Sequence, residues 1–282
     1  MTGFALSHDQ IVTHLRQLPA LPSAVSDLLL SFDREDIDVG VLAGKIARDQ
    51  ALTARVLRVA NSSFYGMPSR VATINEAVVV LGFRAMRSMV LAVGMSGVFQ
   101  ADKVPGFAVQ AYLRHSVATG LAARALAPLV GLNPDLAFTA GVLHDIGRLL
   151  LASNFSQHYA AVLRRREQDD ALDLTAEREV LGIDHAAIGG LLAQTWRFPA
   201  ALHEAVAFHH EPALAPNGSF AGLIHVADGL AHALALSGMA EEQLMPIEEA
   251  AWNALGLDAG KVQSVLPKIL ADLDDTCQAL MP

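Results

Sequence analysis

Apolar residues recur along this chain every three to four positions, which is the spacing of one face of an α-helix. After Pro19-Ala20-Leu21-Pro22, for example, this spacing links Val25, Leu28 and Phe32. Turns that contain Gly, Pro or Ser separate such segments. No segment alternates apolar and polar residues as a half-buried strand would. The pattern predicts an all-α fold, a multi-helix bundle, with its first helices over residues 23–32, 38–46, 52–59, 73–81 and, after a pause at Gly82, 84–99.

A second group of helices is expected after Asp102-Lys103-Val104-Pro105-Gly106, a segment whose composition marks an internal boundary. Asn133-Pro134-Asp135 begins one of them, because proline suits the first turn of a helix. That helix is predicted to carry His144 and Asp145 in its middle. The others are predicted over residues 107–130, 157–166, 174–181, 185–196, 199–209, 220–236 and 259–280. We therefore divide the chain into an N-terminal helical subdomain, residues 1–105, and a C-terminal one, residues 106–282.

The composition indicates how these helices pack. The 282 residues are 52% hydrophobic, which is enough for one large core or two modest ones. Only 6% are aromatic, so the core must consist mostly of Ala, Leu and Val. Small side chains of this kind favour helices that approach one another closely.

Charge is distributed unevenly. Residues 1–100 hold 9 Lys or Arg against 8 Asp or Glu, a net charge of +1, whereas residues 101–282 hold 11 against 21, a net charge of −10. An acidic C-terminal half argues against a nucleic-acid surface, which needs a basic footprint. It agrees with a half that binds cations, although a soluble acidic surface is equally common.

The sequence predicts a cytoplasmic protein. Its single cysteine, Cys277, cannot form an intramolecular disulfide, which fits a reducing compartment. The first ten residues lack the basic and apolar regions of a secretory signal. The longest uninterrupted apolar stretches fall short of the ~20 residues that span a bilayer, so no membrane is expected.

The adjacent pair His144-Asp145 is the strongest chemical signal in the sequence. An imidazole nitrogen beside a carboxylate that can bridge two cations suits hard or borderline metals. Five further potential ligands lie in segments that are expected to be helical: His115, His185, His209, His210 and Asp228. A pair that is buried and hydrogen-bonded without metal is the alternative, although an unpaired Asp228 within its apolar run would be costly.

Three segments in the N-terminal half resemble the HDOD family, the output-domain relatives of the HD phosphohydrolase superfamily. They are Leu18-Pro19-Ala20-Leu21-Pro22, the block from Ala51 through Asn61-Ser62-Ser63-Phe64-Tyr65-Gly66, and the segment from Ile74 to Phe83. With the His-Asp half, the resemblance spans roughly residues 10–240. It implies an all-α fold and a signalling role in bacteria, often beside receiver or sensory domains. It also implies that catalysis is usually unproven.

In the HD superfamily the metal ligands follow the order His, His-Asp, further His residues and a distal Asp. The resemblance therefore implies one or two transition-metal ions, with iron or manganese favoured and zinc possible. Asp145 would bridge them, with His115, His144 and Asp228 on one ion and His185, His209 and His210 on the other. Three more histidines of this half, His203, His225 and His232, are interpreted as packing or surface residues.

The related HD-GYP phosphodiesterases are similar at these positions, but this chain departs from them in three places. Pro212-Ala213-Leu214 follows His209-His210-Glu211, and no Gly-Tyr-Pro comes after it. Arg148 replaces a lysine that follows the His-Asp pair; its planar fork could still hold a phosphate. Ala111 replaces a carboxylate that some relatives use for a third metal.

Two classes of function follow. We favour a signalling output module that binds metal without strong catalysis, acts with other signalling proteins and has a nucleotide as a possible ligand. The alternative is a metal-dependent phosphohydrolase acting on a nucleotide or cyclic nucleotide, with Asp145 and Arg148 as catalytic residues. A di-iron enzyme that uses oxygen is a weaker third reading. Two other segments, Asn61-Ser62-Ser63 and Arg164-Arg165-Arg166, are interpreted as a helix stop and a solvated helix face.

Overall fold

The computed structural model describes residues 4–31, 38–62, 65–66, 70–96, 99, 104–169, 171–215, 219–239 and 243–280. Over these ranges the regular secondary structure is helical and contains no strand, so the predicted all-α fold is confirmed. Five residues named above lie outside the described ranges: Phe32, Ser63, Phe64, Asp102 and Lys103.

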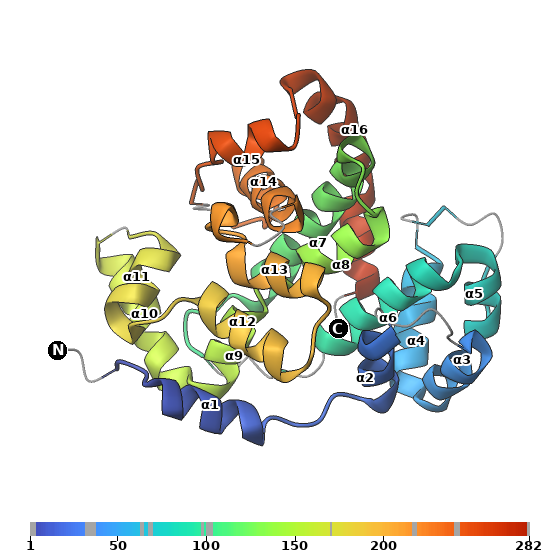
Figure 1. The fold of residues 1–282 in the computed structure, drawn as a ribbon, viewed down its shortest axis with the longest axis horizontal. Helices are drawn as coiled ribbons and strands as arrows, with labels where there is room; N and C mark the ends of the chain where they lie inside the picture. The colour runs from blue at the N-terminus through green and yellow to red at the C-terminus, as the bar shows by residue number, and fades with distance from the viewer. Residues whose placement is uncertain are drawn as a thin grey trace.

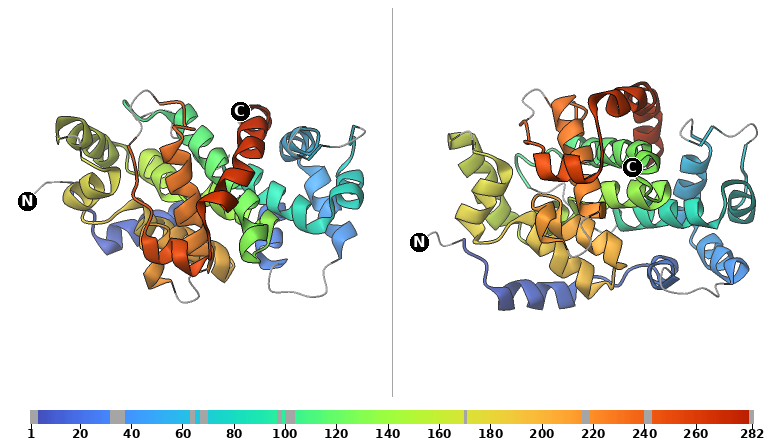
Figure 2. Two further views of the ribbon diagram at one scale, coloured as in Figure 1. Left: turned by 90° about the horizontal axis from the view of Figure 1, so that it is seen from above. Right: turned by 45° about the horizontal axis from the view of Figure 1, so that its top comes forward.

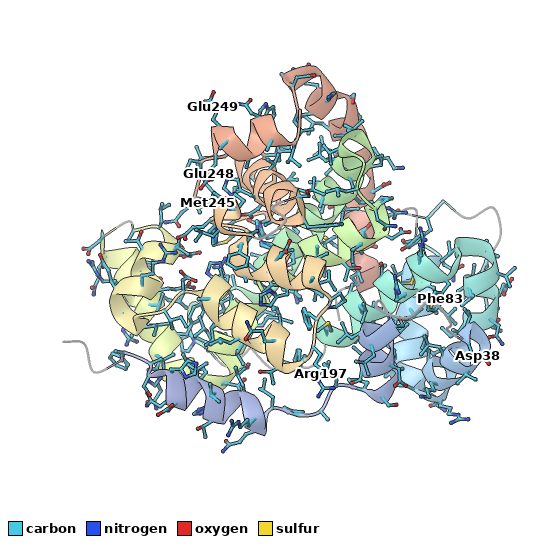
Figure 3. The ribbon with its side chains drawn as sticks, viewed as in Figure 1. Asp38, Phe83, Arg197, Met245, Glu248 and Glu249 are labelled. Carbon is cyan, nitrogen blue, oxygen red and sulfur yellow. The ribbon has the colours of Figure 1, made fainter. Side chains whose placement is uncertain are left out.

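Short capped helices form the N-terminal part of the fold, on the right of Figure 1. The side chains of Asp38, Asp49 and Thr73 each accept a hydrogen bond from a backbone N–H in the first turn of the helix that follows. Asp38, at the start of its helix, is labelled in Figure 3. These helices are α2 (Ser23–Leu30), α3 (Val39–Arg48), α4 (Gln50–Ala60), α5 (Ile74–Leu81) and α6 (Phe83–Ser96).

The predicted helix stop after α4 is confirmed. Asn61 Nδ2 donates to the carbonyl oxygens of Leu57 and Val71, at 2.7 and 2.8 Å, and Asn61 Oδ1 accepts from the N–H of Val71 at 2.7 Å. Ser62 Oγ donates to Val59 O at 2.7 Å. The two side chains satisfy carbonyl groups that the end of the helix leaves free, and they fasten the following loop to it.

Helix α1 (His8–Gln17) was not predicted. A capping box between Ser7 and Gln10 starts it, and it buries only Ile11 and Leu15. Although it is first in the chain, α1 packs on α12, among the C-terminal helices (Figure 1). Just before it, the N–H of Leu6 donates to Leu181 O at 2.8 Å. The division at residue 105 stays a prediction. Helix α1 precedes residue 105, but it packs on α12, which follows that residue.

The C-terminal helices surround the long helix α7, against which α8, α14 and α16 pack. Two glycines let α7 and α8 touch: a Cβ added to Gly141 would lie 2.6 Å from the Cα of Gly120. This part contains α7 (Val109–Leu126), α8 (Pro134–Leu143), α9 (Ile146–Asn154), α10 (Ser156–Asp169), α11 (Asp173–Leu181), α12 (His185–Thr195), α13 (Ala200–Phe208), α14 (Ser219–Ala233), α15 (Glu249–Ala254) and α16 (Ala259–Leu280), with 3-10 turns at Ala127–Val130 and Pro212–Leu214.

One apolar core runs through both groups of helices. Helix α6 packs on α8, and the last helix, α16, returns to contact α4. Figure 2 shows α16 in red between the C-terminal helices and the blue and cyan N-terminal ones. A polar contact also crosses the junction, since Thr139 Oγ1 donates to Ser88 O at 3.3 Å.

The segment Pro134–Asn154, 21 residues long, is by length and composition alone apolar enough to cross a membrane, although charged residues interrupt it. In the structure, 83% of its most apolar 18-residue window is buried inside the protein, and it contains two helices, α8 and α9. Burial of this kind is what the central helices of a helical domain show, so the segment is weak evidence for a membrane span.

Candidate metal centre

The pair His144-Asp145 lies at a break between helices, and the prediction that it lies in the middle of one helix is wrong. Helix α8 ends at Leu143 and α9 begins at Ile146. On a continuous helix, neighbouring side chains diverge by about 100°. The break allows both to face one site, where His144 Nε2 lies 3.5 Å from Asp145 Oδ1.

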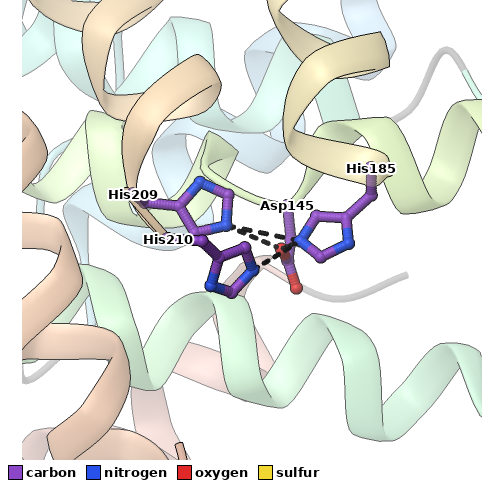
Figure 4. Close-up of side chains that lie close together, drawn as sticks. All are labelled: Asp145, His185, His209 and His210. Carbon is purple, nitrogen blue, oxygen red and sulfur yellow. Dashed lines mark hydrogen bonds and ion pairs between the residues drawn. The ribbon is translucent and has the colours of Figure 1, made fainter. Parts of the chain in front are cut away.

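The Asp145 carboxylate is the centre of a buried group of imidazoles. Its Oδ1 lies 3.1 Å from His185 Nε2 and 3.5 Å from His209 Nε2. His210 completes the group, with its Nε2 2.9 Å from His185 Nε2. Figure 4 shows His209 and His210 facing His185 beside Asp145. Helix α12 supplies His185, and the residues directly after α13 supply the other two.

Hydrogen bonds on the far side of three rings determine their tautomers. His144 Nδ1 lies 2.7 Å from Gly141 O, and His209 Nδ1 lies 3.0 Å from Val206 O. His185 Nδ1 lies 2.7 Å from Glu177 Oε2. Carbonyl and carboxylate oxygens accept, so each Nδ1 donates its proton there and each Nε2 faces Asp145. Metal-binding histidines are held in this way.

A second carboxylate, that of Asp228 on α14, lies close to three imidazoles. Its Oδ1 lies 2.9 Å from His115 Nε2, 3.6 Å from His144 Nε2 and 3.4 Å from His232 Nε2. His144 therefore stands between the two carboxylates, and all seven predicted ligands lie in one connected cluster. The interpretation of His232 as a packing or surface residue is wrong. Its position one helical turn after Asp228 was the signal that could have revealed it.

Electrostatics keep both carboxylates charged. Burial disfavours ionisation, yet the neighbouring imidazoles outweigh it and hold the pKa values of Asp145 and Asp228 well below their usual range. Burial lowers the pKa values of His209 and His210, which stay neutral as ligands must be. For His185, burial is outweighed by Glu177 and Asp145, so its pKa is raised well above normal. Metal binding would displace that proton.

Arg148 lies on α9, beyond the break at His144-Asp145, and its guanidinium group already donates three hydrogen bonds. Nη1 donates to Asp145 Oδ2 at 3.3 Å, and Nη2 donates to Asp173 Oδ2 at 2.7 Å. Nε donates to the Tyr159 hydroxyl at 3.2 Å. These bonds hold the second oxygen of Asp145 in place while its Oδ1 faces the histidines.

A cavity, partly open to solvent, adjoins the site. Phe107 and Tyr112 line its apolar side, and Asp145 and His210 are exposed to it. Arg166 also lines it and donates from Nη1 to Asp173 Oδ1 at 2.9 Å. The interpretation of residues 164–166 as a solvated face is therefore wrong for Arg166. The cavity gives small molecules access to the cluster.

The family model described as "HDOD domain" matches residues 18–212 of this chain. The chain belongs to the HDOD domain family. The resemblance noted in the sequence is thus confirmed.

Three solved structures are similar over nearly the whole chain. A candidate phosphohydrolase from Shewanella amazonensis SB2B is 30% identical, with 99% of this chain and 98% of that chain covered and a TM-score of 0.77. An HDOD domain protein of unknown function from Geobacter sulfurreducens is 21% identical, with 97% and 98% covered and a TM-score of 0.79. A candidate signal transduction protein from Marinobacter aquaeolei VT8 is 24% identical, with 99% and 63% covered and a TM-score of 0.80. The Geobacter and Marinobacter structures have the same fold as this chain.

Among curated proteins, an uncharacterised protein of Treponema pallidum is 27% identical over 210 residues. The match covers 73% of this chain and 40% of that protein. This HDOD chain therefore spans less than half the length of that relative.

Glu177 is a residue that the sequence did not single out. It is fully buried on α11, and its Oε2 accepts from both the backbone N–H of His185, at 2.8 Å, and His185 Nδ1, at 2.7 Å. A carboxylate behind a histidine ligand fixes the ring and raises its basicity. The turn between Leu181 and His185, which joins α11 to α12, brings the two residues together.

We expect Glu177→Gln to weaken metal retention by the HDOD protein about 10- to 100-fold, because outer-shell partners of histidine ligands contribute that much. Competition with a chelator measures the affinity. Glu179→Gln is the matched control, since Glu179 is on the same helix but half-exposed and paired with Arg165. Equal affinities for both variants would contradict the role given to Glu177.

Proposed function

We propose that this protein is a signalling output module of the HDOD type that holds one or two transition-metal ions and has little hydrolytic activity. The observation that carries the proposal is the common orientation of His144, His185 and His209. Each ring is fixed through Nδ1 and directs Nε2 at the ionised carboxylate of Asp145. In this role its partners are other signalling proteins, and its compartment is the cytoplasm.

The residues present fit the group that the family implies. Two buried carboxylates among six imidazoles form a mixed nitrogen and oxygen donor set, which suits iron, manganese or zinc. Asp145 would be shared, with His185, His209 and His210 holding one ion, and with His115, His144 and Asp228 holding the other. Bound ions would supply Lewis acidity and activate a water molecule for attack on a phosphorus atom.

The contacts of Arg148 argue against fast turnover. Its guanidinium group already donates to Asp145, Asp173 and Tyr159. A phosphate would have to share the group with these acceptors. Arg148 therefore serves better as a positioning residue for Asp145 than as a clamp for a substrate.

A second candidate function, a metal-dependent phosphohydrolase, is favoured by one observation. The cavity, which Arg148 and Arg166 also line, opens directly onto Asp145 and His210. The similarity to the candidate phosphohydrolase from Shewanella also supports a phosphohydrolase function. In that case Asp145 would hold both ions and Arg148 would face the phosphate.

We expect protein loaded with iron or manganese to show turnover near background on a panel of nucleotides and cyclic nucleotides. The physical reason is that Arg148 and Arg166, the arginines lining the cavity, are already paired with Asp173. Release of phosphate or of a linear nucleotide measures the activity. Turnover that is lost in both His144→Ala and Asp145→Ala, but is kept in His203→Ala outside the cluster, would overturn the proposal in favour of the phosphohydrolase.

A further inference from the structure

His232 is placed to bind an ion. It follows Asp228 by one turn on α14, and its Nε2 lies 3.4 Å from Asp228 Oδ1. The rings of His232 and His115 lie 4.4 Å apart between centroids. The side chain is 18% exposed and lines the cavity, so it is held in the protein yet can be reached from solvent.

The ligand atoms of His115, Asp228 and His232 form one group, each within 4.8 Å of the others. Two ligands that each bind an ion at about 2.1 Å can be at most about 4.2 Å apart. The Nε2 atoms of His115, His232 and His144 lie 2.9, 3.4 and 3.6 Å from the same Asp228 oxygen. A salt bridge to Asp228 alone would need one imidazole, whereas three imidazoles around one carboxylate oxygen form a donor set for a transition metal.

We propose that His232 is a protein ligand of the ion at Asp228, in a position that the family's ligand order leaves to solvent. The inference rests on the proposed metal centre and adds a residue to it. That ion would then have protein donors from His115, His144, His232 and Asp228, together with the shared Asp145.

With His232 bound, the ion at Asp228 would have one fewer coordination position for water or substrate. Catalytic sites keep such a position open, whereas structural sites are closed by protein ligands. The additional donor therefore agrees with a centre that retains metal better than it turns over substrate.

The experiment compares the wild-type protein with His232→Ala and His203→Ala, all loaded with cobalt(II). His203, half-buried on α13 and bonded to Gln194 at 3.3 Å, is the matched control. Elemental analysis gives the number of ions, chelator competition gives the affinities, and visible absorption reports the imidazoles bound. We expect the wild type and His203→Ala to hold two ions. In His232→Ala one ion should bind at least about 10-fold more weakly, with added imidazole restoring its absorption.

His232→Gln keeps the size of the side chain, and it stands in for the alanine variant if that variant does not fold by circular dichroism. The same loss in His232→Gln would support the assignment. If the variants keep both ions with wild-type affinity and spectrum, His232 is not a ligand, although the metal centre stands. If the wild-type protein binds no cobalt, the proposed centre itself is wrong.

Discussion

Replacing Asp145 with alanine should remove most of the metal from the purified protein, down to about a tenth or less of the wild-type content. Asp145 is the one carboxylate proposed to be shared by both ions, and its Oδ1 lies within 3.5 Å of the Nε2 atoms of His144, His185 and His209. Loss of an outer-shell partner already costs about 10- to 100-fold in affinity, so loss of the shared ligand must cost more. Elemental analysis of protein purified without an affinity tag or added chelator measures the effect.

Two controls sharpen this experiment. Asp145→Asn keeps the shape of the side chain and removes its charge, so it should lose metal almost as fully. Asp27→Ala removes a partly exposed carboxylate that pairs with Lys45 in the N-terminal helices, and it should leave the metal content unchanged. Wild-type protein without metal, or Asp145→Ala with its full complement, would show that the ligand assignment is wrong.

Gly147→Ala should destabilise the fold by about 3 kcal/mol and lower the metal content with it, because overpacking of rigid backbone is costly. Gly147 lies in the first turn of α9 and faces the first turn of α12. An added Cβ would overlap the carbonyl oxygen of His185, and it would lie 2.9 Å from its carbonyl carbon and 3.0 Å from the nitrogen of Gly189. These are backbone atoms, so the contact can be relieved only by moving α12 and the imidazole of His185 with it.

Gly222→Ala is the matched control for this substitution. Gly222 also lies in a helix of the C-terminal half, but a Cβ there meets nothing closer than 4.0 Å. Alanine should therefore stabilise α14 by about 0.5–1 kcal/mol. Urea denaturation gives the free energy of unfolding of each variant. A Gly147→Ala protein as stable as the wild type would mean that α9 and α12 do not meet as described.

Local patterns in the sequence predicted much of the fold. The last helix was placed over residues 259–280 and is found there as α16, because its apolar residues repeat without interruption. Helix α1 was not predicted because its buried face consists of only two residues, Ile11 and Leu15. The break at His144-Asp145 was also missed, since no proline or glycine stands at those two positions.

The sequence by itself determined that the chain is helical, that it belongs with HDOD proteins and which seven residues are candidate ligands. Each of these rests on residue types, on their order and on spacings of a few positions. Only the tertiary structure decided that Glu177 holds His185, that His232 joins Asp228 and His115, and that Arg148 is bound to Asp173. These contacts depend on how closely α7, α8, α9, α12 and α14 approach and at what angle. That geometry is set by backbone contacts at Gly120, Gly141 and Gly147, between helices that lie apart in the sequence.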